Sequence, residues 1–320
     1  MDRATVSNRV ALAAFALALG GCGEANVPES GTGGSAGAGG FAGSTAGGGS
    51  AGTPDGGNGG NGASSGSGGA SGGAGGGGGG SGGSAGAPPF ACTSSGDSMK
   101  MVAVPAGDFI MGCNAALDQD CSDDEKPMRT VKLAAFEIDE TEVTQDMYAA
   151  CVIAGACDPP SCAWDCNKKD YAASCIDWGR AKMYCAFAKK RLPTEAEWEK
   201  AARGTDGRKY PWGNSEPSCE QANMSGCGEK AKPAGSLPKG ASPYGALDMS
   251  GNMVEMLADW YDKAYYQTAP NVDPKGPLKG TTYVGRGGGY KSTAVWMRAS
   301  SRDWYDTYDL GDRLGFRCAK

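Results

Sequence analysis

The stretch Arg191-Leu-Pro-Thr-Glu-Ala-Glu-Trp-Glu-Lys-Ala-Ala-Arg-Gly204, followed by Tyr210-Pro-Trp-Gly213, carries the clearest local signals in this chain of 320 residues. Thr194 and Glu197 have the spacing of a capping box, in which each side chain bonds to the backbone at the position of the other. Gly204 then supplies the residue type that commonly ends a helix. The stretch therefore predicts a helix between Thr194 and Gly204.

Two further helices are indicated upstream by their capping residues. Thr144 precedes a helix expected over residues 145–153, with Gly155 beyond its end. Asp177 precedes a second helix, on which apolar residues recur at helical spacing. The residues of this stripe are Ala181, Tyr184, Cys185 and Ala188.

The strands are indicated by alternating apolar residues. Residues 101–112 predict two short strands with a turn at Pro105-Ala-Gly107. Residues 131–138 predict a third strand with a bulge at 134–135. The chain after Gly204 shows little periodicity until residues 283–286, so loops are expected over most of that length.

The N-terminus has the features of a bacterial lipoprotein signal. Arg3 and Arg9 form a basic region, and residues 10–19 form an apolar core too short to span a bilayer. Leu19-Gly-Gly-Cys22 then resembles a lipobox, which makes Cys22 the lipid attachment point. Gly23 after the cysteine favours sorting to the outer membrane. An ordinary secretory signal cleaved nearby is the alternative.

The chain is expected to have three parts: a signal peptide at 1–22, a tether rich in Gly, Ser and Ala at 23–90, and a folded domain at 91–320. Glycine supplies 55 residues, most of them in the tether, which has little to bury and much backbone entropy to lose. Roughly 65 flexible residues span about 45 Å, so the tether gives the domain reach. Membrane attachment is expected only through the lipid anchor.

Charge and cysteine content restrict the functional class. The net charge of −6 argues against nucleic acid as a partner. Of 13 cysteines, twelve remain if Cys22 is lipidated, an even number that fits disulfides in an oxidising compartment. The chain has no histidine and no paired C-x-x-C, which disfavours a zinc site. Two local disulfides are expected at short separation in loops, Cys113–Cys121 and Cys219–Cys227.

Further motifs extend over residues 101–319. They are Glu142-Val-Thr144, Ile176-Asp-Trp178, the segment 242–252, Asp259-Trp-Tyr261, Arg286-Gly-Gly288 and Gly315-Phe-Arg-Cys-Ala319. With the capping-box helix and residues 210–213, they resemble the formylglycine-generating enzyme, or sulfatase-modifying factor, family in the family's own order. The resemblance implies an α+β, C-type-lectin-like fold that is rich in disulfides and low in regular secondary structure.

The resemblance also implies a copper site, because the family binds copper with two cysteines and oxidises a cysteine in a partner sulfatase. Ser292 and Met297 occupy the corresponding positions. Neither a hydroxyl nor a thioether replaces a thiolate pair as a soft Cu(I) site, so copper binding is not expected. The related iron-dependent sulfoxide synthases are excluded, because their metal sits on histidines.

The chain departs from the family pattern elsewhere as well. Val254-Glu-Met256 replaces a Trp-Glu-Trp, Arg129 replaces a common histidine, and residues 151–175 carry five additional cysteines. The family pattern implies a Cys185–Cys318 disulfide between the second helix and the C-terminal strand. Six cysteines then allow fifteen pairings, which stay open. They are Cys92, Cys151, Cys157, Cys162, Cys166 and Cys175.

Structural calcium is a second implication of the resemblance. Family members carry calcium around the Gly-Asn-x-x-Glu region, and this chain has Asn252 and Glu255 there, with Asn223 as a further oxygen ligand. The alternative is that Asn252 caps a turn and Glu255 belongs to a hydrogen-bond network.

A ligand pocket is expected near the C-terminus, where aromatic and charged residues cluster. The candidate residues are Tyr290, Ser292, Trp296, Arg298, Trp304 and Tyr305. This chemistry suits a peptide or a carbohydrate, and a rigid core with variable loops can bind without catalysis. We therefore expect a non-catalytic binding module displayed on the cell envelope. The alternatives are a formylglycine-generating oxidoreductase, another enzyme that uses the same pocket, and a purely structural envelope protein.

Overall fold

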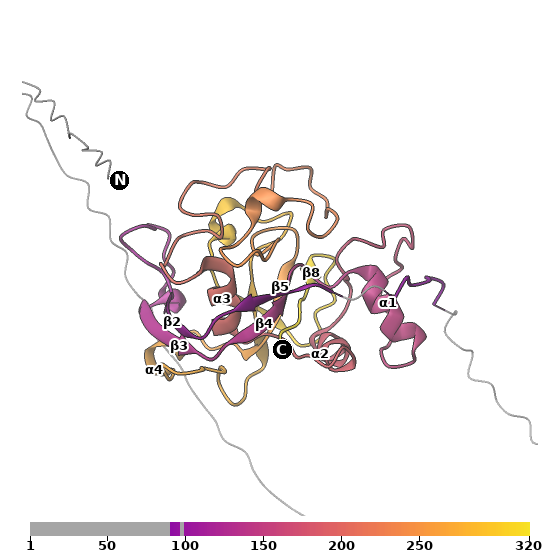
Figure 1. The fold of residues 1–320 in the computed structure, drawn as a ribbon, viewed down its shortest axis with the longest axis horizontal. Coiled ribbons are helices and arrows are strands. Elements are labelled where there is room, and N and C mark those ends of the chain that lie inside the picture. The colour runs from indigo at the N-terminus through magenta and orange to yellow at the C-terminus, as the bar shows by residue number, and fades with distance from the viewer. Residues whose placement is uncertain (1–89, 97–98) are drawn as a thin grey trace, which may run out of the picture. The chain divides into compact units, whose positions relative to one another are not determined.

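The computed structural model describes residues 90–96 and 99–320. The expected signal peptide with Cys22 and nearly all of the tether lie outside these residues. In the described part, short strands cross the middle of the molecule, and the helices lie around them (Figure 1).

Two antiparallel pairs form the N-terminal part of the fold. Strand β1 (Met101–Val104) pairs with β4 (Phe136–Asp139), and β2 (Gly107–Met111) pairs with β3 (Arg129–Leu133). The predicted strands are present, but the first two pair with the third segment and not with each other. At residues 134–135, where a bulge was expected, the strand is interrupted completely. The two halves of the segment, β3 and β4, therefore pair with different strands.

The three long helices begin at the predicted caps. In α1 (Gln145–Ile153) the Thr144 side chain accepts from the backbone N–H of residue 147, and in α2 (Trp178–Phe187) Asp177 accepts from that of residue 180. Helix α3 (Glu195–Arg203) has both halves of the capping box, and Gly204 ends it with φ 72°. Local hydrogen bonds therefore set where these helices begin.

A four-stranded sheet occupies the C-terminal half. Its order is β7 (Asp303–Asp306), β6 (Thr282–Arg286), β5 (Val254–Trp260) and β8 (Leu314–Gly315). The expectation of loop was wrong for β5, which lies inside this sheet. Its first four residues are all buried, so the alternation that marks a half-exposed strand is missing.

Short elements complete the fold. They are the 3₁₀ turns η1 (Asp123–Glu125), η2 (Pro238–Gly240) and η3 (Ala294–Met297), and the helix α4 (Tyr265–Thr268). Trp198 of α3 is fully buried in the larger hydrophobic cluster. Tyr148 of α1 and Tyr184 of α2 pack against Phe316 in a second hydrophobic cluster. Figure 1 shows α3 against the strands and α1 and α2 together at one end.

All twelve described cysteines form disulfides. The three predicted pairs are present, Cys113–Cys121, Cys219–Cys227 and Cys185–Cys318. The pairings that the sequence left open are Cys92–Cys166, Cys151–Cys157 and Cys162–Cys175. Five of the six cysteines of the latter pairs lie in residues 151–175, so this segment is held by covalent links in place of a large core of its own.

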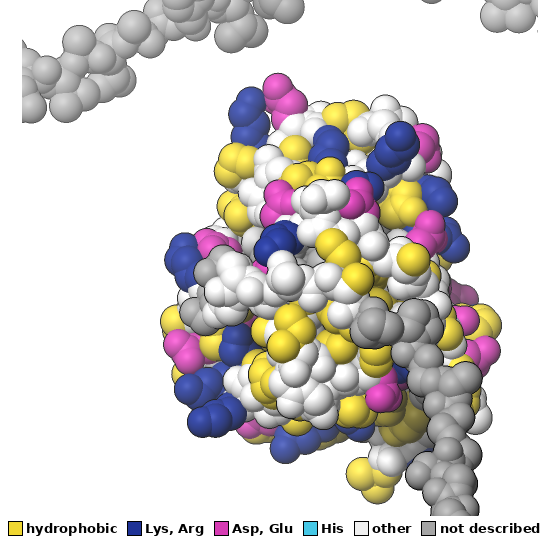
Figure 2. Space-filling model, turned by 90° about the vertical axis from the view of Figure 1, so that its right-hand side faces the viewer, with side chains coloured by type: hydrophobic (Ala, Val, Ile, Leu, Met, Phe, Trp, Pro, Cys, Tyr) yellow, Lys and Arg dark blue, Asp and Glu magenta, His cyan; other side chains and the backbone are white. Residues whose placement is uncertain are grey.

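The surface carries charges of both signs. Figure 2 shows basic and acidic side chains interspersed on one face, with apolar side chains between them. Over residues 90–96 and 99–320, no helix combines the length and apolar character needed to cross a bilayer.

Candidate functional site

A network of buried charged side chains underlies the region in which a ligand pocket was predicted. Glu195 and Glu199 point from α3 into the core, and both accept hydrogen bonds from Arg286 of β6 at 2.8 Å. Arg302 binds the same Glu195 through two nitrogens, at 2.7 and 3.0 Å. Paired and hydrogen-bonded charges of this kind can be buried, whereas a lone charge is very costly. The network fixes the chain just before β7 onto α3.

Arg298 holds an acidic loop, residues 114–125, against the same region. Its guanidinium donates to both Glu125 oxygens at 2.8 and 2.7 Å and to Asp118 at 3.0 Å. Ser300 also donates to Glu125, at 3.0 Å. Arg298 is only 2 % exposed, so it forms the base of the pocket and its charge is already neutralised.

A cavity of about 460 Å³ lies above this base, between the acidic loop and residues 295–304. Of the six residues expected to form a ligand pocket, Trp296, Arg298 and Trp304 line this cavity. Tyr261 and the acidic loop close the opposite side and were not predicted. Because these residues lie far from 295–304 in the sequence, no local pattern marks them as neighbours. The further lining residues are Asp120, Ser122, Asp124, Glu125, Lys263, Val295, Ser301, Arg302 and Asp303.

The two tryptophans give the cavity an exposed aromatic rim. Trp296 is 39 % exposed and Trp304 is 55 % exposed, although each carries a large apolar ring. Tyr261 donates from its hydroxyl to Asp124 at 2.9 Å, and burial raises the pKa of Tyr261. Burial opposes ionisation of Asp124, but hydrogen bonds from Ser122 and Tyr261 lower the pKa of this carboxyl overall. The cavity therefore combines aromatic faces with an ionised carboxylate.

Three predicted pocket residues lie elsewhere. The Tyr290 hydroxyl donates to Asp312, and its ring is 6 % exposed. Tyr305 stacks on Tyr283 and borders a separate, smaller cavity. Ser292 accepts from the backbone N–H of residue 289 at 3.0 Å, so its hydroxyl stabilises a turn.

The residues at the family's copper positions do not fit copper. Met297 is fully buried beside Tyr210 and Ala222, and Ser292 offers a neutral oxygen. Every cysteine among the described residues is in a disulfide, so none of them can supply a thiolate. Since Cu(I) prefers soft thiolate ligands, the donor set is unsuited to it.

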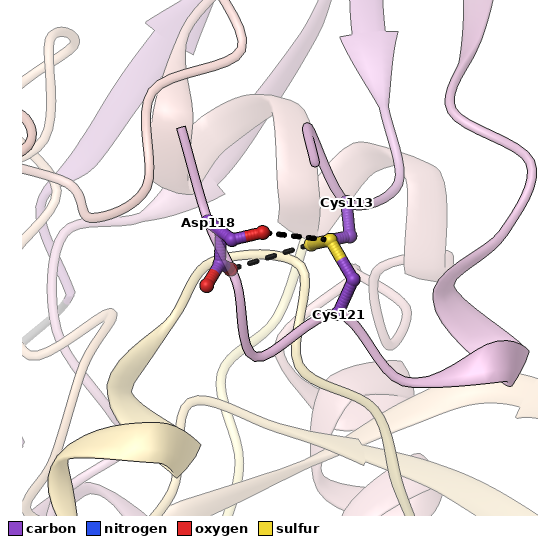
Figure 3. A group of neighbouring side chains, drawn as sticks. All are labelled: Cys113, Asp118 and Cys121. Atoms are coloured by element: carbon purple, nitrogen blue, oxygen red, sulfur yellow. Dashed lines mark hydrogen bonds between the residues drawn. A yellow bond between two sulfur atoms is a disulfide. The ribbon is translucent and has the colours of Figure 1, made fainter. Parts of the chain in front are cut away.

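One group of side chains has the spacing of a metal site but not the chemistry. Cys113, Asp118 and Cys121 place their ligand atoms within 4.8 Å of one another. Figure 3 shows the two sulfur atoms joined as a disulfide, with Asp118 beside them. A disulfide sulfur carries no negative charge and is a poor metal ligand. Asp118 instead pairs with Arg298.

The residues predicted for calcium separate into two environments. Asn252 is fully buried, donates to Glu142 at 2.9 Å and accepts from the Asn223 side chain at 3.1 Å. Glu255 instead pairs with Arg317 at 2.6 Å and accepts from the Trp198 indole at 2.8 Å. Glu255 therefore belongs to a hydrogen-bond network, which is the alternative left open for it.

Glu142 is the acidic neighbour of Asn252 that the sequence analysis missed. Within the described residues, its Oε2 atom and the Oδ1 atom of Asn223 are buried without a hydrogen-bond partner. Burial, together with the negative charges of Asp248 and Glu255, raises the pKa of Glu142 well above its ordinary value. Unsatisfied buried oxygens of this kind fit a hard cation, which binds through oxygen ligands.

Comparison with known proteins assigns the family. Residues 89–320 match the sulfatase-modifying factor enzyme 1-like domain. The chain is 30% identical over 284 residues to the formylglycine-generating enzyme of Streptomyces coelicolor, with 68% of this chain and 88% of that protein covered. It therefore belongs to the sulfatase-modifying factor family, which agrees with the resemblance and with the fold.

The family is not uniform in activity. Hercynine oxygenase of Mycolicibacterium smegmatis is 28% identical over 243 residues, which cover 63% of this chain and 57% of that protein. The solved structure of PvdO from Pseudomonas aeruginosa has a TM-score of 0.59 and 26% identity, over 68% of this chain and 93% of its own. Treponema denticola variable protein 1 shares the fold, with a TM-score of 0.58 over 71% of this chain and 96% of its own, at 23% identity.

Proposed function

We propose that this protein is a cell-envelope lipoprotein whose domain binds a ligand without catalysis. The observation that carries the proposal is the cavity with the rim of Trp296 and Trp304, in a domain with no free thiol among its described cysteines. A pocket of this volume is typical of ligand sites, which combine apolar walls with a few polar groups.

The ligand class follows from the lining. The two exposed indoles offer flat apolar faces, which suit sugar rings and the side chains of peptides. Asp120, Asp124 and Asp303 place carboxylates at the wall and Lys263 adds an ammonium group. Arg298 and Arg302 are already paired. We therefore propose a peptide or a carbohydrate with mixed polar and apolar surface.

An enzyme remains the second candidate, because the Streptomyces coelicolor relative is named a formylglycine-generating enzyme and is 30% identical. In the family that this chain resembles, formylglycine formation needs two thiolates beside the substrate. Ser292 and the buried Met297 provide no thiolate, and every described cysteine is in a disulfide. A different chemistry in the cavity could use lining groups such as Asp124, Lys263 or Tyr261.

The anchor is part of the same proposal. Cys22 would carry the lipid at the outer membrane, and the tether would hold the domain away from it. The chain just after the tether would be held by the Cys92–Cys166 disulfide. It would also be held by the Ser94 hydroxyl, which donates to the backbone carbonyl of Asp146 in α1 at 2.8 Å. Recovery of wild type in membranes and of Cys22→Ala in the soluble fraction is expected, and membrane recovery of the variant would contradict the anchor.

Structural calcium is proposed for the cluster of Asn223, Asn252 and Glu142. The unsatisfied buried oxygens of Glu142 and Asn223 and the raised pKa of Glu142 support a cation there. EDTA should lower the melting temperature of wild type, and calcium should restore it. Glu142→Gln should remove this response, because a neutral amide binds calcium weakly. An identical melting curve with and without EDTA would contradict the site.

The ligand proposal is tested with arrays of peptides and oligosaccharides. Wild type should bind one class, and Trp296→Ala with Trp304→Ala should weaken that binding at least about tenfold, since each indole is a principal contact. Tyr308→Ala is the matched control, because Tyr308 is 86 % exposed and does not line the cavity. Binding that survives loss of both tryptophans would show that the cavity is not the site.

A further inference from the structure

A second cleft lies away from the tryptophan-rimmed cavity and has different chemistry. Its volume is about 440 Å³, and it is bounded by the end of α2, the start of α3 and the middle of β5. Ala186, Leu192 and Ala258 form apolar walls. Because two of these side chains are alanines, the backbone elements leave space between them that a larger side chain would fill.

The charges around this cleft are mainly positive. Lys182, Lys190, Arg191 and Lys275 line it, against the single carboxylate of Glu197. This balance contrasts with the net charge of −6 of the whole chain. An excess of cations in a concave site attracts anions and raises their local concentration.

Two of the four cations are already neutralised. Arg191 makes two 2.6 Å hydrogen bonds to Glu197, and Lys190 lies 2.5 Å from Asp139. Lys182 lies 4.1 Å from the centre of the Trp178 ring, and Lys275 is exposed. Within residues 90–96 and 99–320, no carboxylate pairs with Lys182 or Lys275. Two ammonium groups are therefore available to one anionic ligand.

We propose that this cleft binds an anionic amphiphile, a molecule with an alkyl chain and a carboxylate or phosphate head. The chain would lie against Ala186, Leu192 and Ala258, and the head would bind Lys182 and Lys275. Burial of the chain supplies affinity in proportion to its apolar area, and the ammonium groups select the sign of the head. This site is independent of the peptide or carbohydrate cavity.

Calorimetric titration of the purified domain with decanoate, decyl phosphate and decyltrimethylammonium tests the proposal. At least one of the two anions should bind, and the cation with the same chain should bind at least about tenfold more weakly. Decanoate and decyl phosphate distinguish a fatty-acid head from a phospholipid head. Failure of both anions to bind, or equal binding of the cation, would overturn the proposal.

Charge-reversed variants distinguish anion binding in the cleft from a general effect of surface charge. Lys182→Glu with Lys275→Glu should weaken anion binding at least about tenfold, whereas Lys168→Glu with Lys230→Glu changes the net charge equally and should not. Ala186→Phe should also weaken binding, because it fills the space at an exposed helix position. Unchanged melting temperatures establish that the variants are folded, and equal losses in both charge-reversed variants would refute the site.

Discussion

The Cys185–Cys318 disulfide should contribute more to stability than any short disulfide in the domain. It joins residues separated by 133 positions, whereas Cys219–Cys227 spans 8. In the chain-entropy description, a cross-link restricts the unfolded chain by an amount that grows with the logarithm of the loop length. The long loop corresponds to about 5 kcal/mol and the short loop to about 2.5 kcal/mol.

The perturbation is Cys185→Ala with Cys318→Ala, and the matched control is Cys219→Ala with Cys227→Ala. Alanine avoids placing a hydroxyl at positions 185 and 318, which are fully buried. The free energy of unfolding is measured from guanidinium titrations followed by tryptophan fluorescence. The long-range variant should lose about 2.5 kcal/mol more than the control. Equal losses would refute the reasoning, because they would show that loop length does not set the contribution.

Two further perturbations test the buried charges. Arg298→Met should lower the free energy of unfolding by about 3–5 kcal/mol, because it leaves Glu125 and Asp118 buried without their cation. The control Arg208→Met breaks a partly exposed ion pair with Asp206 and should lower it by about 1 kcal/mol or less in the same titration. In EDTA, the raised pKa of Glu142 means that the folded protein binds this proton more tightly than the unfolded chain, so stability falls as pH rises above the ordinary value of 4.5. Glu142→Gln should therefore gain stability over wild type between that value and neutral pH, and parallel melting-temperature profiles for the two proteins would contradict this.

The helix boundaries could be predicted because their signals are local. Thr144, Asp177 and Thr194 each accept a hydrogen bond from a backbone three residues away, so the sequence contains both partners. Strand β5 could not be predicted in this way. Its Glu255 is neutralised by Arg317 and its Asp259 accepts from the backbone of Glu195, partners that only the folded chain brings near.

The residues of the tryptophan-rimmed cavity could likewise be predicted only in part. Trp304 and Tyr305 are adjacent aromatic residues on β7, and successive strand residues point to opposite faces. Trp304 therefore reaches the cavity, whereas Tyr305 pairs across the sheet with Tyr283. Alternation within residues 303–306 could have separated these two residues. The acidic wall at Asp124 could not have been found in this way, because the contacts that position it, such as the hydrogen bond from Arg302 to its backbone carbonyl, are long-range.

An activity assay on the purified domain, with its disulfides formed, tests most directly whether the domain lacks the family's catalytic activity. The domain is loaded with copper and incubated with a Cys-x-Pro-x-Arg peptide and a reductant, with the Streptomyces coelicolor relative as the positive control. Because Ser292 and Met297 provide no thiolate pair, mass spectrometry should find the peptide cysteine unchanged. Repeated conversion of that cysteine to formylglycine would contradict the proposal of a non-catalytic domain, since it would require a catalytic centre that the described side chains do not provide.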